Sequence, residues 1–230
     1  MPLIDLSVLG FEDADADFMS SRYLGNLGLG REATAWMDRD NRCVYKLFDL
    51  KLDPENRASM GLMLHLNITS PFEAELQQIP ATVSHILEKL CVLHEAGACP
   101  TEIVGLSLDG KYLIAKQPHC KNYHDLDEDR KVAVADMRGV APKGSFGGDQ
   151  LYVFHSGGRD WMLSDLHKGN IRRLENRRPT IIDALIGEIS QEQRTALPKL
   201  ENAVSHARQL ASGAEPLSDD PFFGVDDSEL

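Results

Sequence analysis

Residues 161–171 read WMLSDLHKGNI, and residues 180–187 read TIIDALIG. In both stretches a run of strand-forming apolar residues ends abruptly at an aspartate, Asp165 in the first and Asp183 in the second. A carboxylate is the side chain that such a run is least able to bury, so each run predicts a buried strand that delivers its acid to a cleft. The sequence NIRRLENRRPTIID between them predicts a hairpin that turns at ENRR and sets the two acids side by side.

The polar residues of these two stretches have the chemistry of a phosphotransfer site. Asp165 and Asn170 are five residues apart across a loop that contains Gly169, so both polar ends can point into one cleft. Magnesium prefers a few hard oxygen ligands, which Asn170 and Asp183 can supply. Asp165 is then left to orient an acceptor hydroxyl and to take its proton. Alternatively, both acids cap turns and Asn170 holds a left-handed backbone position.

Two upstream features supply what a nucleotide phosphotransferase also needs. The segment GNLGLG, residues 25–30, places three glycines between a strand and its return, where the backbone can approach an anion closely. Lys46 follows in the strand VYKLF, which pairs with that region, so its stem could reach the same phosphates. The alternative is that the glycines serve only a turn and that Lys46 is a solvated residue.

Together these stretches resemble the catalytic loop, metal-binding aspartate, glycine-rich loop and phosphate-contacting lysine of the protein-kinase-like superfamily. The motif DLHKGN resembles the corresponding motif of aminoglycoside and choline phosphotransferases and other atypical kinases more closely than that of eukaryotic protein kinases. The small size and the segment LIAKQP resemble the kinase-like domain of polyvalent proteins in phages and mobile elements. The resemblance implies an α+β fold of two lobes, with a β-rich N-lobe and a reduced, mainly helical C-lobe, that binds ATP and Mg²⁺.

The resemblance spans about residues 22–190 and implies a role for each matching residue. Asp165 would be the catalytic base, Asn170 and Asp183 the magnesium ligands, and Lys46 the contact to the α- and β-phosphates. The other implied nucleotide contacts are Gly25, Gly28 and Gly30 of the glycine-rich loop and Ala115, Lys116 and Gln117 of the adenine-binding hinge. Glu88 would be the ion-pair partner of Lys46, with Glu73 and Glu75 as alternatives.

The chain also departs from the family pattern. Leu163 and Ser164 stand where His-Arg usually precedes the catalytic aspartate, so regulation by activation-loop phosphorylation is not expected. Fewer than fifty residues follow Asp183, too few for a large peptide-docking platform. The expected function is therefore γ-phosphoryl transfer to a hydroxyl of a protein or a small molecule. A pseudokinase that binds nucleotide or partners, and a nucleotidylyl transferase, are the alternatives.

Charge and hydropathy restrict the other possibilities. The chain of 230 residues has a net charge of −12, but residues 1–20 hold five acids and residues 215–230 hold six, with no Lys or Arg in either. The body between them therefore carries only about −1 (−12 + 11), and it contains a basic stretch at 168–178 that could hold phosphates or be a solvated surface. No apolar run is long enough for a membrane span and no signal peptide is recognised, so a cytoplasmic protein without a membrane or nucleic-acid partner is expected.

The chain order predicts four regions. Strands flank the turn RDN, a short helix runs from Pro71 to before Pro80, a longer helix ends near Gly97, and two strands surround a DG turn. A further helix, two strands about a Gly-Gly turn, the ENRR hairpin and a helical segment interrupted at Pro198 follow. The expected regions are an acidic segment 1–20, an N-lobe 21–117, a C-lobe 118–211 and an acidic tail 212–230.

The four cysteines show no CxxC pair or metal-ligand spacing. Reduced, mostly buried thiols are therefore expected rather than disulfides or zinc ligands. His119, Cys120 and His124 could approach a metal, but without a fourth ligand they are expected to lie in a surface loop.

Overall fold

The computed structural model of the protein describes most of the chain as two compact units. The described residues are 1–6, 24–29, 32–50, 57–71, 73–143 and 150–213. Most of the two acidic end segments, Gly30 and most of the Gly-rich stretch 141–150 lie outside them. The first unit comprises Met1–Leu62, Pro80–Cys91 and Cys99–Cys120, and the second comprises Met63–Ile79, Val92–Ala98 and Lys121–Leu230.

The expected lobes and the two units differ in detail. The expected boundary near Pro118 lies two residues before the end of the first unit at Cys120. Residues 63–79 and 92–98, which the sequence assigns to an N-lobe, group with the second unit. The chain therefore passes between the units several times.

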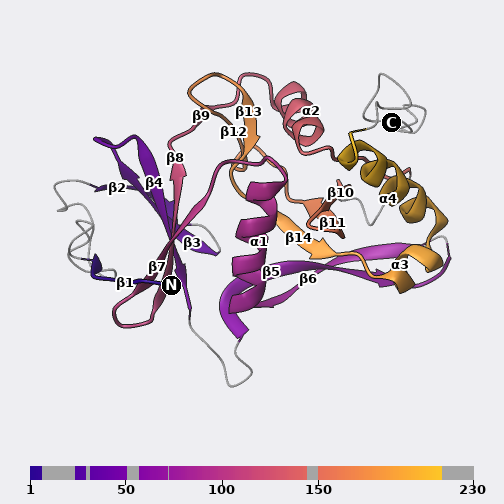
Figure 1. The fold of residues 1–230 in the computed structure, drawn as a ribbon, viewed down its shortest axis with the longest axis horizontal. Coiled ribbons are helices and arrows are strands. Elements are labelled where there is room, and N and C mark those ends of the chain that lie inside the picture. Colours follow the sequence, from indigo (N-terminus) through magenta and orange to yellow (C-terminus); the bar gives the residue numbers. More distant parts are fainter. Residues whose placement is uncertain (7–23, 30–31, 51–56, 72, 144–149, 214–230) are drawn as a thin grey trace. The chain divides into compact units, whose positions relative to one another are not determined.

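A six-stranded sheet in the order β1-β7-β8-β4-β3-β2 forms the first unit (Figure 1). β1 pairs with β7 in parallel, and the other neighbours are antiparallel. The predicted strands around the RDN and DG turns are confirmed as β3 with β4 and β7 with β8. The strands are β1 (Leu3–Ile4), β2 (Leu24–Leu29), β3 (Ala33–Asp38), β4 (Cys43–Asp49), β7 (Glu102–Ser107) and β8 (Tyr112–Pro118).

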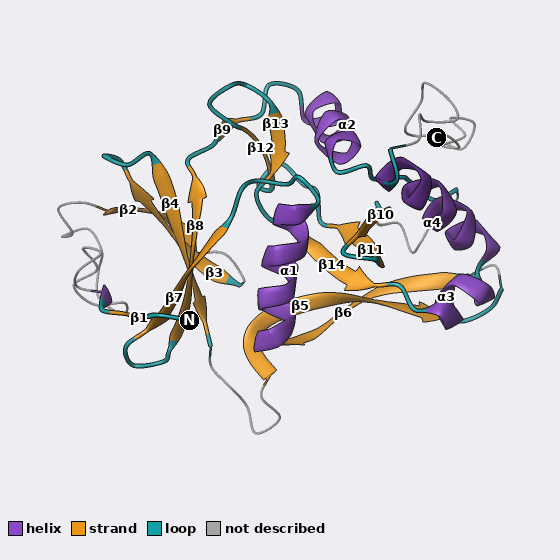
Figure 2. Cartoon of the chain, in the orientation of Figure 1, coloured by secondary structure: helices purple, strands orange, loops and turns teal. Residues whose placement is uncertain are grey.

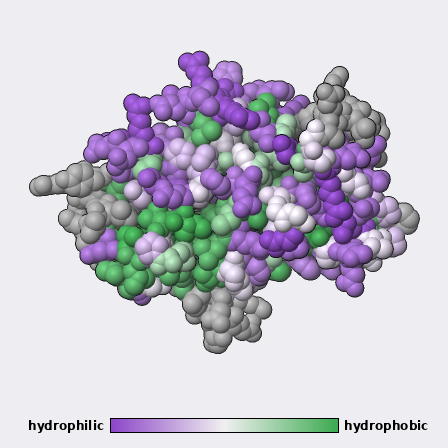
Figure 3. All heavy atoms as spheres, in the orientation of Figure 1, coloured by the Kyte–Doolittle hydropathy of each residue, from purple (hydrophilic) through white to green (hydrophobic). Residues whose placement is uncertain are grey.

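The two faces of this sheet bury different side chains, because successive residues of a strand point to opposite sides. Cys43, Tyr45 and Leu47 of β4 pack in one apolar cluster with Trp36 and Ile114. On the surface, hydrophobic residues gather over the part of this unit where β1 and β7 lie (Figure 3), and Met1, Leu3 and Leu108 are exposed there.

The predicted short helix from Pro71 to before Pro80 is wrong. This segment contains β6 (Ala74–Thr82), which pairs with β5 (Arg57–Ile68) in a two-stranded sheet. Ser70 Oγ accepts a hydrogen bond of 3.1 Å from Glu73 N, as a helix cap would, but the chain then continues extended. A Ser-Pro pair initiates turns as well as helices, so Ser70 and Pro71 do not distinguish a helix start from a turn that leads into a strand. The longer predicted helix is confirmed as α1 (Val83–Glu95).

The second unit combines strands and helices (Figure 2), in agreement with the expected α+β class, while the mainly helical character of the C-lobe stays a prediction. It contains a sheet of order β10-β11-β14 and a sheet of order β13-β12-β9. The predicted Gly-Gly and ENRR hairpins are confirmed. The elements are β9 (Lys121–Asn122), α2 (Leu126–Asp136), β10 (Tyr152–Ser156), β11 (Arg159–Ser164), β12 (Ile171–Arg173), β13 (Pro179–Ile181), β14 (Leu185–Glu188), α3 (Gln191–Ala196) and α4 (Pro198–Ala211).

Local signals explain where the helices of this unit begin. The Asp125 side chain accepts hydrogen bonds from the first backbone amides of α2, and Ser190 forms a capping box with Gln193 at α3. Pro198, the predicted break, is the first residue of α4, where its missing amide costs nothing. Within the described ranges, no helix combines the length and apolarity that crossing a membrane requires.

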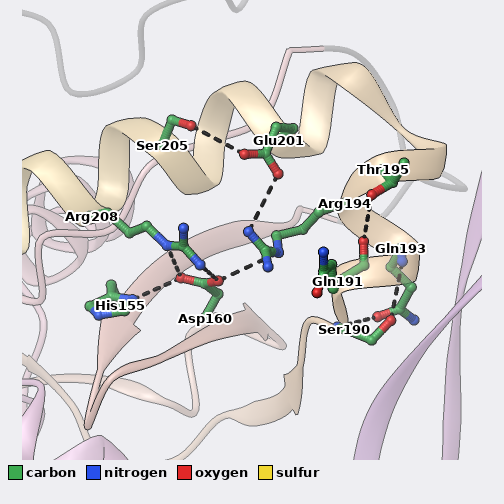
Figure 4. Close-up of polar contacts among 10 residues, drawn as sticks. All are labelled: His155, Asp160, Ser190, Gln191, Gln193, Arg194, Thr195, Glu201, Ser205 and Arg208. Carbon is green, nitrogen blue, oxygen red and sulfur yellow. Dashed lines mark hydrogen bonds and ion pairs between the residues drawn. The ribbon is translucent and has the colours of Figure 1, made fainter.

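A buried carboxylate ties two of these helices to the sheet (Figure 4). Asp160 on β11 is 4 % exposed and accepts hydrogen bonds from Arg208 Nε (2.9 Å) and Nη2 (2.7 Å) on α4. His155 Nδ1 lies 2.7 Å from Asp160 Oδ1, and Arg194 Nε of α3 lies 3.7 Å from its Oδ2. Burial alone would raise the pKa of Asp160, but the hydrogen bonds and charges of Arg208 and His155 outweigh it and lower the pKa.

We expect Asp160→Asn to lower the free energy of unfolding by about 1–3 kcal/mol at pH 7, because three cationic or polar partners lose a buried charge. Because its pKa is lower in the folded than in the unfolded protein, ionised Asp160 stabilises the fold above the unfolded pKa of about 3.9. This stabilisation is lost as the pH falls through the lower pKa of the folded state. The difference between the two proteins, measured by urea unfolding, should therefore shrink below about pH 4.

Glu188→Gln is the matched control, since its pair with Arg159 is 3.1 Å long but half-exposed on both sides. That change should cost less than about 0.5 kcal/mol. Equal losses in the two variants, or a difference for Asp160→Asn that does not change with pH, would contradict the assigned role.

At Gly187 on β14 the backbone of β5 approaches the sheet closely. A Cβ atom at Gly187 would lie 2.1 Å from the carbonyl oxygen of Leu64. We expect Gly187→Ala to destabilise the protein by about 1–3 kcal/mol or more in thermal or urea unfolding, because main-chain atoms cannot rotate away. Gly25→Ala, where the nearest atom is 4.0 Å away, should change stability little, and equal effects would contradict this reasoning.

Candidate functional site

The loop after β11 joins the predicted catalytic base, Asp165, to the predicted magnesium ligand Asn170. Asn170 Nδ2 donates to the backbone carbonyl of Asp165 at 2.8 Å and to its carboxylate Oδ2 at 3.3 Å. Both partners are acceptors, so the nitrogen of the amide faces Asp165 and its Oδ1 faces away. Asp165 has a φ of 67°, the left-handed region that residues other than glycine rarely adopt. Such backbone strain concentrates at functional sites.

The hairpin β12–β13 brings Asp183 to the end of the hairpin at which Asn170 lies. Ile171 pairs with Ile181, and Ile182 N donates to the carbonyl of Asn170 at 2.9 Å. Asp183, the next residue, is half-buried, and its Oδ1 accepts from Ala184 N at 2.9 Å. Two stretches that are separate in the sequence thus place their predicted ligands at one end of one hairpin.

The donor set at this end fits magnesium. Asn170 Oδ1 has no hydrogen bond to any described residue, so it is an available neutral oxygen, and Asp183 adds a carboxylate. Magnesium is commonly held by one or two such groups together with substrate oxygens. In the described part of the chain there is no group of three or more His, Cys, Asp or Glu side chains that could hold a metal.

A pocket of about 330 Å³ lies beside Asp165, entirely within the second unit. Arg130 of α2 is held in it, because its Nε donates to the carbonyl of Leu166 (3.0 Å) and its Nη1 to Gln150 Oε1 (2.8 Å). The pocket therefore combines a carboxylate, a guanidinium, amides and apolar walls. Its lining residues are Leu64, Leu76, Gln78, Arg130, Gln150, Ser164, Asp165, Leu166, His167 and Leu185.

In the first unit, the predicted phosphate-contacting lysine lies in a row of small residues. Gly28 pairs with Ala35, Ala35 with Lys46, and Lys46 with Ala115. Residues directly opposite each other share one face of a sheet, so the stem of Lys46 is flanked by small side chains on both neighbouring strands. The pairing of β2 with β3 shifts register between Asn26 and Gly28, and Gly28 has a φ of 143°. Gly25 lies in the same strand, and Gly30 is outside the described residues.

The predicted hinge is part of the sheet. Ala115 and Lys116 on β8 pair with Lys46 and Tyr45 of β4 on one side and with Ile103 and Glu102 of β7 on the other. The Gln117 side chain is buried and donates to Thr101 Oγ1 at 2.8 Å. Adenine binding by these three residues stays a prediction.

The ion pair that α1 makes differs from the expected one. Lys89 pairs with Glu32, which precedes β3; both side chains are buried, and Glu32 also accepts from Leu62 N at 2.9 Å. Sequence reasoning missed this pair, although Lys89 falls on the apolar stripe of the helix. Glu88 is half-buried on the same helix, and its pairing with Lys46 stays a prediction, as do the alternatives Glu73 and Glu75.

The basic stretch 168–178 is partly neutralised by α2. Arg173 Nε donates to Asp129 Oδ2 at 2.7 Å, and Arg178 Nε donates to Asp136 Oδ2 at 2.6 Å. The hydrogen bond from Arg173 lowers the pKa of the Asp129 carboxyl against the opposing effect of burial. These two arginines thus hold α2 against the hairpin β12–β13.

Comparison with known proteins adds no assignment to this geometry. No family model matches the sequence, and neither the curated proteins nor the solved structures contain a significant match. The candidate site is therefore defined by the chemistry and positions of its own residues.

Proposed function

We propose that the protein is an ATP- and Mg²⁺-dependent phosphotransferase that transfers a γ-phosphoryl group to a hydroxyl. The observation that carries the proposal is the position of Asn170, whose side chain binds Asp165 and whose backbone binds the residue before Asp183. A pair of turn-capping acids would not require an asparagine that joins both loops. The resemblance in sequence motif and the oxygen donors at this end of the hairpin support the same reaction.

Each residue has a separate task in the proposed reaction. The Asp165 carboxylate accepts the hydrogen bond of the acceptor hydroxyl and takes its proton late, because the transition state of phosphoryl transfer is loose. Asn170 keeps that carboxylate oriented through its amide nitrogen and offers its Oδ1, with Asp183, to the metal. Magnesium, when bound, supplies positive charge to the phosphate oxygens. Lys46, flanked by small residues, is assigned to the phosphates on the basis of the resemblance.

The pocket beside Asp165 favours a small molecule as the acceptor. Its volume of about 330 Å³ is at the lower end of the range for small-molecule sites. Arg130 suits an anionic or strongly accepting group of the acceptor, and Leu64, Leu76 and Leu185 suit an apolar body. A folded protein substrate would use a larger and flatter surface.

Transfer from ATP labelled at either the γ or the α position tests the reaction. We expect label to leave the γ position in the presence of magnesium, and Asp165→Asn to lower kcat by about 10²- to 10⁴-fold because proton transfer is lost. Asp183→Ala should abolish the response to magnesium. Asp40→Asn changes an exposed aspartate of the β3–β4 turn and should leave turnover unchanged.

Two outcomes would overturn this proposal in different ways. Transfer of the α label would identify a nucleotidylyl transferase. If there is no turnover, and stabilisation of the fold by ATP is the same in wild type and Asp183→Ala, the chain is a binding module rather than an enzyme.

A substitution that fills the pocket separates the two kinds of acceptor. Leu76→Trp should reduce transfer to small hydroxy acids, amino alcohols and polyols by about tenfold or more, because the larger ring occupies their space. Hydrolysis of ATP by water and transfer to serine-containing peptides should be unchanged. A loss of peptide transfer with retention of small-molecule transfer would contradict the pocket as the acceptor site.

A further inference from the structure

Two cysteines that are distant in the sequence lie together in the first unit. The sulfur atoms of Cys99 and Cys120 are 3.7 Å apart, a weak hydrogen-bond contact. Cys99 is buried, whereas Cys120 is half-buried and its thiol lies 3.5 Å from the carbonyl of Pro118. Of the other two cysteines, Cys43 is buried and Cys91 is exposed, so the expectation of mostly buried thiols holds for only half of them.

The pair lies at the two points where the chain enters and leaves the last segment of the first unit. Cys99 begins that segment and Cys120 ends it. The segment contains β7 and β8, including the three predicted hinge residues. A short polar chain also connects its ends, because Gln117 Nε2 donates to Thr101 Oγ1 (2.8 Å), which donates to the carbonyl of Cys99 (3.0 Å).

We propose that Cys99 and Cys120 form a reversible oxidation site that closes to an intramolecular disulfide. A disulfide needs a sulfur separation of about 2.05 Å, so the thiols must approach by about 1.7 Å, which small rotations of two side chains can supply. Among the described residues no third His, Cys, Asp or Glu completes a metal site with them. The inference does not depend on the proposed phosphotransfer.

Hydrogen peroxide is the oxidant that the reaction requires. The Cys120 thiolate attacks one peroxide oxygen, the O–O bond breaks, and the leaving hydroxide is protonated to water, which leaves a sulfenic acid. The Cys99 sulfur then attacks the Cys120 sulfur, the S–O bond breaks, and the departing hydroxide takes the Cys99 proton as water. Two thiols and one peroxide thus give one disulfide and two waters.

The order of these steps follows from the surroundings of the two thiols. The hydrogen bond with Cys120 and burial raise the pKa of the Cys99 thiol, while the charge of Lys46 acts in the opposite direction. Cys99 therefore remains a protonated thiol and is shielded from solvent. Cys120, the more exposed partner, is the thiol that meets the oxidant first.

Peptide mapping of the 230-residue protein tests the proposal. The protein is treated with hydrogen peroxide and EDTA, its remaining thiols are alkylated, and tryptic peptides are analysed by mass spectrometry. We expect residues 90–111 to be linked to residues 117–121, and dithiothreitol to reverse the link. Since 90–111 contains both Cys91 and Cys99, the link must persist in Cys91→Ser and be lost in Cys99→Ser.

Comparison with the unfolded chain shows whether the folded geometry selects the pair. In urea, oxidised Cys120 should link to both Cys91 and Cys99 and less often to the more distant Cys43, because loop closure depends on separation along the chain, whereas in the native protein it should link to Cys99 alone. The same mixture of links in both conditions would overturn the proposal. So would native Cys120 that oxidises to the sulfinic acid without any link to Cys99.

Discussion

The amide of Asn170 is the contact on which the candidate site depends. The side-chain nitrogen of Asn170 donates to the backbone carbonyl and the carboxylate of Asp165, and the backbone carbonyl of Asn170 accepts a hydrogen bond from Ile182 N. Asp165 ends a buried strand in a left-handed conformation that costs of order 1–3 kcal/mol in a residue other than glycine. That conformation persists because the hydrogen bonds of Asn170 and the buried strand β11 restrict the loop on both sides.

Buried charges hold the surrounding elements in the same manner. Three ion pairs have at least one side chain that is almost completely buried. They are Asp129–Arg173, Asp160–Arg208 and Glu32–Lys89. A buried charge is tolerated only when it is paired and hydrogen-bonded, so each pair fixes the element that carries its partner. The pair Asp129–Arg173 thus adds a directional polar contact to the apolar cluster in which Ala133 and Val134 of α2 meet Ile171 and Ile181.

Most elements could be predicted from local patterns, and the failures have physical causes. Turn residues identified the hairpins around residues 39–42 and 174–178, and helical spacing identified α1. The strand β6 was missed because Ser70 and Pro71 signal a turn and a helix start equally well. The pair Glu32–Lys89 could not be predicted, since its members are 57 residues apart and no pattern in the sequence couples them.

The sequence identified Asp165 and Asp183 because each is a polar residue at the end of an apolar run, and Asn170 because it lies five residues after Asp165 across a loop that contains Gly169. The row Gly28, Ala35, Lys46 and Ala115 carries no such signal, since it arises from the register of four strands. A lysine is buried to 8 % exposure only where polar or anionic groups offset its lost hydration. Small neighbours on both sides leave room for such a group to approach the stem and ammonium of Lys46. The glycine and alanines on the flanking strands therefore shape the surroundings of Lys46, whose contact with phosphates is the proposed one.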